Sequence, residues 1–222
     1  MISMLENGED LHNKVACAAF DKQPDQVTYE ERQASKIINY LTNYGGNSWI
    51  LRESIIKSVG VEYSIEECQR IMDARFKVWP EIPQWWDSVF TTLEESLTLT
   101  NLTGRVKPFF ERRHIEKRGQ LIRNAALEKN ARAWLNQSTV ADVTKLAMIR
   151  LHEASKKTDK FNFLLEVHDS LTVEYKAGQE EYVSAIIREC FDIELDAGWR
   201  KYTIPVSMEV GPNFGELKEY KG

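Results

Sequence analysis

One segment of the chain carries four side chains at intervals of four residues, and their types suit a charged, planar ligand. The row consists of Arg32, Lys36, Tyr40 and Tyr44. In an α-helix each of these side chains lies one turn above the last, with a slow drift around the axis. Two cations could hold phosphate groups, and two rings could lie against a base or a sugar. A surface helix whose tyrosines pack on a neighbouring element would give the same spacing, so both interpretations are open at this point.

A single carboxylate separates two apolar segments later in the chain. In "LLEVHDSLTVEY" the trio His168-Asp169-Ser170 stands between the arms Leu164–Val167 and Leu171–Tyr175, a pattern typical of a β-hairpin. If both arms belong to a core, the carboxylate is held rigidly at an exposed turn, which suits a metal ligand. The alternative is an aspartate that only stabilises the turn through its own backbone.

The charge distribution indicates a possible surface for a polyanion. The net charge is −5, which alone argues against a nucleic-acid binder. Residues 105–132 nevertheless hold nine bases and three acids, so this window carries +6 and the remainder −11. A solvated helical face also explains such a window. The bases are Arg105, Lys107, Arg112, Arg113, Lys117, Arg118, Arg123, Lys129 and Arg132.

The segment "NQSTVADVTKLAMI", from Asn136 to Ile149, begins with amides and hydroxyls before an apolar run. Gln137 in this segment could contact the minor groove of a nucleic acid. A capping or simply exposed role is equally consistent with the pattern.

Two capping boxes predict the helices that carry these side chains. The segment "TYEERQASKIINYLTNYGG" starts with Thr28 and Glu31 in capping-box spacing and stops at Gly45-Gly46, so the row of four lies on one helix. The segment "SIEECQRIMDARFKVWP" repeats this plan with Ser64 and Glu67. Its apolar positions form a single stripe, which indicates an amphipathic helix.

The remaining segments predict an α+β chain. We expect short extended pieces and a turn in "TNLTGRVKPFF". Helices come first and a helix-backed antiparallel sheet follows, which favours two subdomains. The further elements expected are helices over Pro83–Leu97, Leu121–Lys156 and Glu180–Leu195, the hairpin, and a strand at Ile204–Val210.

Bulk composition describes an ordinary globular protein. The chain has 222 residues, of which 42% are hydrophobic and 28% charged. No apolar run approaches the roughly 20 residues that a membrane span requires. The three cysteines Cys17, Cys68 and Cys190 lie far apart, which favours reduced thiols and hence the cytoplasm.

Five motifs, in this order, resemble the family A DNA polymerases, the DNA polymerase I type. They are "NGEDLH", "RQASKIINYLTNYGG", "NQSTVADVTKLAMIRLH", "LLEVHDSLTVE" and "VGPNFGELK". The resemblance covers the chain from about Leu5 to Lys218. It implies an α+β fold in which a mainly helical fingers subdomain, residues 1–130 with an N-terminal segment that links to the palm, precedes a palm subdomain. The palm would occupy residues 131–222, with the antiparallel motif C hairpin backed by helices.

The resemblance implies a deoxynucleotide site on the helix that carries the row of four. That helix is similar to motif B, R-x-x-x-K-x-x-x-F/Y-x-x-x-Y-G. Arg32 and Lys36 would contact the triphosphate of the incoming dNTP, joined by His12, and Lys36 would assist catalysis. Tyr40 would stack beside the nucleotide, and Tyr44 would lie near the templating position.

The resemblance also implies contacts to DNA and to metal. "VHDS" is similar to motif C, so Asp169 would bind catalytic Mg²⁺, and His168 would lie near the primer terminus. Gln137 matches a glutamine that touches duplex DNA, Lys129 takes the place of an arginine there, and Arg105 in "TGRVKP" would contact the primer–template. The chemistry implied is addition of dNTPs to a primer 3′-hydroxyl by phosphoryl transfer with two Mg²⁺ ions.

The largest departure from the family is motif A, the "DYSQIE"-like segment expected just upstream of "NGEDLH". The sequence contains no such segment and no thumb. One carboxylate cannot hold two divalent ions, so we expect this polypeptide not to polymerise alone. Smaller departures are Ser170 in place of a glutamate, Leu41 in place of a glycine, Ala133 in place of an asparagine, and Tyr40 in place of phenylalanine.

Three hypotheses follow from these motifs and departures. The chain is the C-terminal subunit of a split polymerase, whose N-terminal polypeptide supplies motif A and the thumb. It is one piece of a longer polymerase, with the same chemistry. It is a non-catalytic DNA-binding remnant of the family. In the first hypothesis, primer–template DNA and dNTPs are ligands, no membrane is involved, and Tyr40 would suit a bacteriophage protein in its host's cytoplasm.

Overall fold

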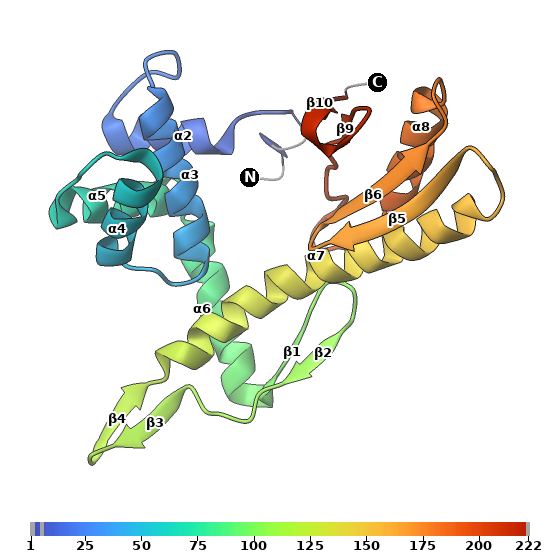
Figure 1. Ribbon diagram of the computed structural model, residues 1–222. Helices are drawn as coiled ribbons and strands as arrows, with labels where there is room; N and C mark the ends of the chain where they lie inside the picture. Colours follow the sequence, from blue (N-terminus) through green and yellow to red (C-terminus); the bar gives the residue numbers. More distant parts are fainter. Residues whose placement is uncertain (1–2, 5–6, 221–222) are drawn as a thin grey trace. The chain divides into compact units, whose positions relative to one another are not determined.

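The computed structural model describes residues 3–4 and 7–220 and shows an α+β chain with two compact units (Figure 1). The first unit contains Met1–Leu99 and Lys107–Trp134, and the second contains Thr100–Val106 and Leu135–Gly222. The expected boundary after residue 130 falls four residues before the geometric boundary after Trp134, inside one helix. Leu5, where the family resemblance begins, lies outside the described residues.

The first unit is mainly helical. Helix α7 begins in it and continues into the second unit. Two short antiparallel ribbons separate α6 from α7. The helices are α2 (Leu11–Phe20), α3 (Tyr29–Asn43), α4 (Ser48–Val59), α5 (Ile65–Val78), α6 (Glu81–Ser96) and α7 (Ala125–Ser155). The ribbons pair β1 (Thr98–Thr100) with β2 (Val106–Pro108), and β3 (His114–Lys117) with β4 (Gln120–Arg123).

Both predicted capping boxes are confirmed. At the start of α3, Thr28 Oγ1 accepts from the backbone N–H of Glu31 at 3.3 Å, and the Glu31 carboxylate accepts from the N–H of Thr28 at 3.0 Å. Ser64 and Glu67 form the same pair of bonds at the start of α5. These bonds satisfy backbone donors that a helix N-terminus otherwise leaves without partners.

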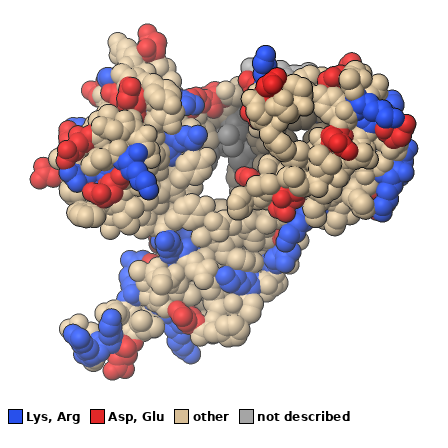
Figure 2. Space-filling view, viewed as in Figure 1, with Lys and Arg blue, Asp and Glu red and all other residues tan. Residues whose placement is uncertain are grey.

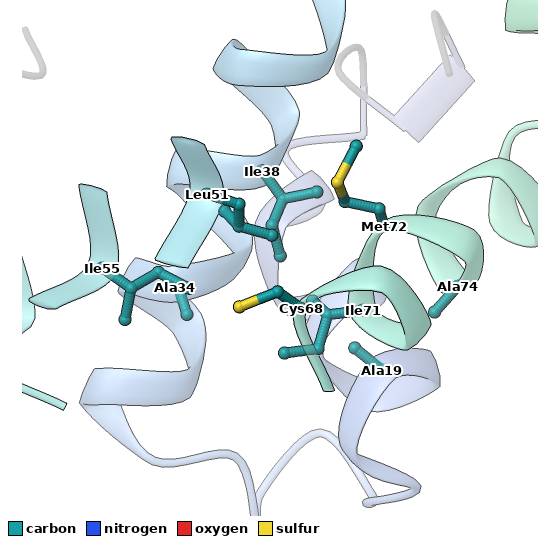
Figure 3. Close-up of a cluster of buried hydrophobic side chains, with 9 residues drawn as sticks. All are labelled: Ala19, Ala34, Ile38, Leu51, Ile55, Cys68, Ile71, Met72 and Ala74. Atoms are coloured by element: carbon teal, nitrogen blue, oxygen red, sulfur yellow. The ribbon is translucent and has the colours of Figure 1, made fainter. Parts of the chain in front are cut away.

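The four helices α2 to α5 share one apolar core (Figure 3). Helix α3 contributes two fully buried side chains, Ala34 and Ile38, and α4 contributes Leu51 and Ile55. Burying one side chain of the size of isoleucine or leucine stabilises the fold by roughly 1.5–3 kcal/mol. Because this face of α3 is buried, the face with Arg32, Lys36 and Tyr40 points away from the core. The cluster also contains Ala19, Cys68, Ile71, Met72 and Ala74.

Gly45, which follows α3, is favoured both by its backbone conformation and by a close neighbour on α7. Its φ of +71° is in the left-handed region, where glycine is favoured. A Cβ atom at this position would collide with the guanidinium of Arg132 on α7. That guanidinium lies 4.6 Å from the ring centre of Trp86 and 5.5 Å from that of Phe90.

The expected helix over Leu121–Lys156 starts too early. Leu121 belongs to β4, where it pairs with Glu116 of β3, and α7 begins only at Ala125. The turn between the strands has positive φ at Arg118 (54°) and Gly119 (76°). Two consecutive positive φ angles are the signature of a type I′ hairpin turn, which the sequence pattern alone did not reveal.

The second unit combines the rest of α7 with short antiparallel ribbons. Its central hairpin packs with α7 and α8 around Leu151, Phe161, Val183 and Cys190 (Figure 1). A second cluster joins Val143 and Ala147 of α7 to Ile193 and Leu195. The elements are β5 (Phe161–Val167), β6 (Ser170–Tyr175), α8 (Glu180–Phe191), β7 (Leu195–Asp196), β8 (Lys201–Tyr202), β9 (Glu209–Val210), a 3₁₀ turn η1 (Phe214–Glu216) and β10 (Lys218–Glu219).

Two expectations for this unit are wrong in detail. The strand expected at Ile204–Val210 is reduced to Glu209–Val210, which pairs with β10. Within β5 only the start is buried, and Leu164 and Val167 are 48% and 51% exposed. The arm Leu164–Val167 therefore does not lie in a core within the described residues.

An ion pair with a buried carboxylate fastens the β1–β2 turn to α7 inside the second unit. The carboxylate of Asp142, almost fully buried, accepts from Nε and Nη2 of Arg105 at 2.9 and 2.5 Å. It also accepts from Asn101 Nδ2 at 2.9 Å and from Thr103 Oγ1 at 2.7 Å. The hydrogen bonds from Arg105, Asn101 and Thr103 together hold the pKa of Asp142 far below its ordinary value, against the opposing effect of burial.

No helix among the described residues combines the length and the apolar character needed to cross a bilayer.

Neutralising Asp142 should destabilise the second unit. Asp142→Asn keeps the shape of the side chain but removes the charge that four donor groups share, so we expect the free energy of unfolding to fall by about 2 kcal/mol. Urea denaturation followed by circular dichroism measures this change. The control is Asp159→Asn, which breaks the exposed pair with Lys176 and should leave the urea midpoint unchanged. Equal midpoints for the two variants would contradict the assignment.

Candidate functional site

The exposed face of α3 presents a cation and an aromatic ring to one pocket. Lys36 and Tyr40 line a pocket of about 370 Å³ together with residues of α4. Tyr40 is 56% exposed. Tyr44 is the C-terminal cap of α3 with φ of −101°, so it leaves the helical row by a backbone turn. The structure therefore brings Lys36 and Tyr40 together at one pocket, with Tyr44 beyond the helix end.

Arg32 is engaged with an aspartate that caps the neighbouring helix. Its Nε donates to Asp10 Oδ2 at 2.6 Å. Asp10 is also the N-cap of α2 and accepts from the backbone N–H groups of His12 and Asn13. Partial burial would raise the pKa of Asp10, but the hydrogen bonds from Arg32, Asn13 and His12 outweigh burial and lower it. The aspartate thus joins the start of α2 to the cationic face of α3.

His12 belongs to the same cluster through an amide that sequence reasoning missed. Asn39 Nδ2 lies 2.8 Å from His12 Nδ1, and the His12 ring centre lies 6.2 Å from that of Tyr40. Buried Arg75 of α5 donates to Asn39 Oδ1 at 3.0 Å and to Asn43 Oδ1 at 2.7 Å. Because Arg75 can only donate, the oxygen of Asn39 faces it and the amide nitrogen faces His12.

This orientation fixes the tautomer of His12. Nδ1 accepts the amide hydrogen, so the proton of the neutral ring is on Nε2, which becomes a donor. Burial lowers the pKa of His12, the charges of Arg32 and Lys36 lower it further, and Asp10 opposes them. Burial also lowers the pKa of Arg75, to about 10. The cluster therefore offers three donors for an anion: Arg32, Lys36 and the Nε2–H of neutral His12.

A signal for the missed residues was present in the sequence. Arg75 lies on the apolar stripe of its helix, beside the buried Ile71 and Met72. A charged residue on such a stripe must find polar partners when it is buried. Asn39 and Asn43 are four residues apart on α3 and provide them.

Asp169 stands at the turn of the β5–β6 hairpin, as predicted. Val167 pairs with Ser170, which leaves His168 and Asp169 as the two loop residues. His168 has φ of +59°, a left-handed conformation that a non-glycine residue adopts at some cost. Ser170 Oγ donates to the carbonyl of Val167 at 2.9 Å and closes the turn. Asp169 is exposed, so its carboxylate is available on a fixed turn.

The described part of this chain does not complete a metal site. Over residues 3–4 and 7–220, no three His, Cys, Asp or Glu side chains lie close enough together to hold an ion. Asp169 offers one carboxylate, and Mg²⁺ requires oxygen ligands in octahedral arrangement. Any ion at Asp169 would need further ligands from water, substrate or another segment.

The predicted DNA-contacting residues are spread over several elements. Lys129 and Gln137 are exposed on α7, and His168 is exposed at the hairpin turn. Arg105 is also exposed, at 55% of its side chain, although two of its nitrogens are engaged by Asp142. The α3 side chains and Lys129 belong to the first unit, and Arg105, Gln137 and Asp169 to the second.

Comparison with known proteins gives one consistent family. The family model described as DNA polymerase family A matches residues 1–216. DNA polymerase I of Chloroflexus aurantiacus is 26% identical over 222 residues, covering 98% of this chain and 22% of that protein. DNA polymerase I of Mycobacterium tuberculosis is 29% identical over 219 residues (97% of this chain, 22% of that protein). The thermostable DNA polymerase I of Thermus thermophilus is 28% identical over 220 residues (97% and 24%).

A solved structure shares the fold. It is described as the POL domain of Pol1 from M. smegmatis in complex with DNA primer-template and dNTP. The match has a TM-score of 0.70 at 26% identity and covers 85% of this chain and 32% of that one. The chain spans less than a quarter of the length of the curated relatives named above.

The lowered pKa of His12 predicts a pH dependence of stability. The unfolded ring has an ordinary pKa of 6.5 and the folded ring a lower one, so the unfolded state binds more protons in the interval between them. The stabilisation is complete above pH 6.5 and is lost as pH falls through the folded pKa. Urea midpoints at pH 7.5, 6.5 and 5.5 should show this decline, and NMR titration of the ring should give the lowered pKa.

His12→Gln is the matched control, because its side-chain oxygen can still accept from Asn39 but does not titrate. The decline between pH 6.5 and 5.5 should be smaller in this variant. A His12 resonance that titrates at or above 6.5 would show that the ring is not held neutral by its surroundings.

Proposed function

This chain belongs to DNA polymerase family A, and we propose that it forms the fingers and the motif C part of the palm of a DNA-directed DNA polymerase. The observation that carries this proposal is the cluster of hydrogen-bond donors formed by α3 and the start of α2. It combines Arg32, Lys36 and the Nε2–H of His12 with an exposed Tyr40. A dNTP matches this set, since it joins a triphosphate to a planar base.

In the proposed complex, each side chain has a separate role. Lys36 and His12 donate to phosphate oxygens, and Arg32 joins them when phosphate replaces the carboxylate of Asp10 as its partner. Arg32 then pairs with the substrate phosphate in place of Asp10, so dNTP binding breaks the ion pair between Arg32 and Asp10. Tyr40 stacks beside the sugar and base, and Tyr44, at the end of α3, lies near the templating base.

The proposed polymer ligand is primer–template DNA. The M. smegmatis structure named above contains DNA primer-template and dNTP, and the same ligands suit the exposed Lys129, Gln137 and His168 of this chain. Arg105 is 55% exposed despite its pair with Asp142, so it would contact a phosphate through its remaining N–H groups. The subdomain assignment, fingers for residues 1–130 and palm for residues 131–222, is part of the same proposal.

We propose that Asp169 is one of the carboxylates that hold catalytic Mg²⁺, and that the motif A carboxylates come from a polypeptide segment outside this sequence. When bound, Mg²⁺ neutralises the charge of the triphosphate. The exposed side of β5 supports an additional segment, because Leu164 and Val167 are about half exposed beside a strand edge that pairs with no described strand. Strands of this kind in native proteins are normally covered.

The missing segment fits a separate N-terminal polypeptide with motif A and a thumb, or an upstream part of one longer chain. The alternative of a non-catalytic DNA-binding remnant rested in part on Ser170. Ser170 closes the hairpin turn by its bond to Val167, so its presence has a structural reason that is independent of lost activity.

Replacing Asp169 should abolish primer extension. The chain is co-purified with the N-terminal polymerase polypeptide of its own source organism. Incorporation of dNTPs into a labelled primer–template is then followed on a gel. Asp169→Ala should reduce extension by at least about 10³-fold, because a metal-holding carboxylate is lost. Asp159→Ala, an exposed aspartate of the same unit, should leave extension unchanged.

Extension by the Asp169→Ala complex at the unaltered rate would refute the role of this carboxylate. Extension by the isolated chain would refute the proposal that motif A is supplied from outside. A complex that binds primer–template but never extends it would favour the non-catalytic alternative.

Replacing Lys36 should weaken dNTP binding by this chain alone. Lys36→Gln removes one charge-assisted hydrogen bond, so we expect the Kd for a fluorescent dNTP to rise roughly tenfold, which corresponds to about 1.4 kcal/mol. Lys77→Gln, on the exposed side of α5, is the control and should not change Kd. Equal affinity for the Lys36→Gln variant and the unaltered chain would place the triphosphate elsewhere.

A further inference from the structure

The structure divides the nine bases of residues 105–132 into engaged and free groups. Five of them have partners: Arg105 pairs with Asp142, Arg113 and Arg123 pair with Glu128, Lys107 bonds Asn130 and Arg132 stacks on Trp86. Within the described residues, the others have no hydrogen bond or ion pair to a side chain of this protein. They are Arg112, Lys117, Arg118 and Lys129.

Three of the four free bases lie in or beside the β3–β4 hairpin, which is anchored firmly at its base. The buried carboxylate of Glu128, on α7, accepts from Arg113 Nε at 2.7 Å and from Arg123 Nη2 at 2.7 Å. Arg113 immediately precedes β3, and Arg123 is the last residue of β4. Asn124 adds a bond from its Nδ2 to Glu111 at 2.7 Å. Arg113 and Arg123 are therefore engaged in anchoring the hairpin to α7.

The other end of the hairpin is a tight turn with exposed side chains. Lys117 pairs with Gln120 across the ladder, and the two residues between them form the type I′ turn. Within its own unit the hairpin extends away from α6 and α7 (Figure 1), and Lys and Arg side chains gather at its free end beside an acidic group (Figure 2). Seven of its eight strand residues are exposed. Such a ribbon buries little apolar surface of its own, and its side chains are available to a partner.

We propose that the β3–β4 hairpin is a clamp for the phosphate backbone of DNA, with Arg112, Lys117 and Arg118 as its contacts. The inference rests on the proposed function, which supplies the DNA. Exposed cations bind DNA phosphates with release of the counterions condensed on the DNA. The hairpin presents few groups that distinguish bases and carries one exposed acid, Glu116, opposite Leu121. Its binding is therefore to the backbone and independent of sequence.

A charge-removal variant tests the clamp. Arg112→Gln, Lys117→Gln and Arg118→Asn are combined, since asparagine tolerates the left-handed conformation of residue 118. Anisotropy of a labelled primer–template is measured with the whole chain at several salt concentrations from 50 to 200 mM. We expect the slope of log K against log salt to shrink by roughly 2–3, at about 0.9 for each phosphate contact. Affinity at the lowest salt should fall roughly 10- to 100-fold.

The matched control removes three exposed cations elsewhere in the same unit: Lys57→Gln, Arg70→Gln and Lys77→Gln. It lowers the net charge equally and should leave the slope within about 0.5 of the unaltered value. Unchanged circular dichroism verifies that both variants are folded. Repeating the titration with a duplex alone and with single-stranded template alone shows which part of the DNA the hairpin binds.

An unaltered slope in the hairpin variant would overturn the clamp and leave the proposed function standing, because dNTP binding by Lys36 is measured separately. An unaltered slope together with lost retention of the N-terminal polymerase polypeptide would identify the hairpin as a protein contact and also overturn the clamp. No salt-dependent DNA binding by the unaltered chain would contradict the clamp and the proposed DNA ligand together.

Discussion

The burial of one face of α3 is the constraint on which the rest of the first unit depends. Ala34 and Ile38 are fully enclosed by α2, α4 and α5, so the helix cannot rotate without losing its core. The opposite face is thereby fixed, and its polar groups are held at defined positions. Arg75 extends this control from the interior, because its two hydrogen bonds hold the amide of Asn39 in one orientation. A core interaction thus decides which nitrogen of His12 carries its proton.

The second unit follows a different principle. The carboxylate of Asp169 is positioned by a two-residue turn. The turn is closed by the hydrogen bond of Ser170 to Val167 and by the left-handed backbone of His168. The strand that leads to the turn is poorly covered along its second half. A well-defined turn beside an uncovered strand is consistent with a sheet that other polypeptide completes.

Periodic patterns predicted much of the fold, and paired interactions were harder to see. The capping boxes at Thr28 and Ser64 placed two helices correctly, since local hydrogen bonds determine helix starts. The helix expected from Leu121 included most of β4, because the hairpin depends on the pairing of β4 with β3 and on the turn at Arg118 and Gly119. The strand at Ile204–Val210 was overestimated, because alternation of apolar residues does not provide a partner strand. At the site, spacing found Lys36 and Tyr40, but Asn39 and Arg75 matter only through contacts between helices.

The contact of Arg132 with Gly45 has a consequence for how this sequence can change over time. A side chain at position 45 needs the volume that the Arg132 guanidinium fills, so substitutions at the two positions depend on each other. A lineage that shortens residue 132 first removes the steric clash, so that only the left-handed backbone at φ +71° still disfavours a side chain at residue 45, whereas the reverse order meets both penalties. Such ordered dependence is epistasis, and here its origin is the space of a single methyl group.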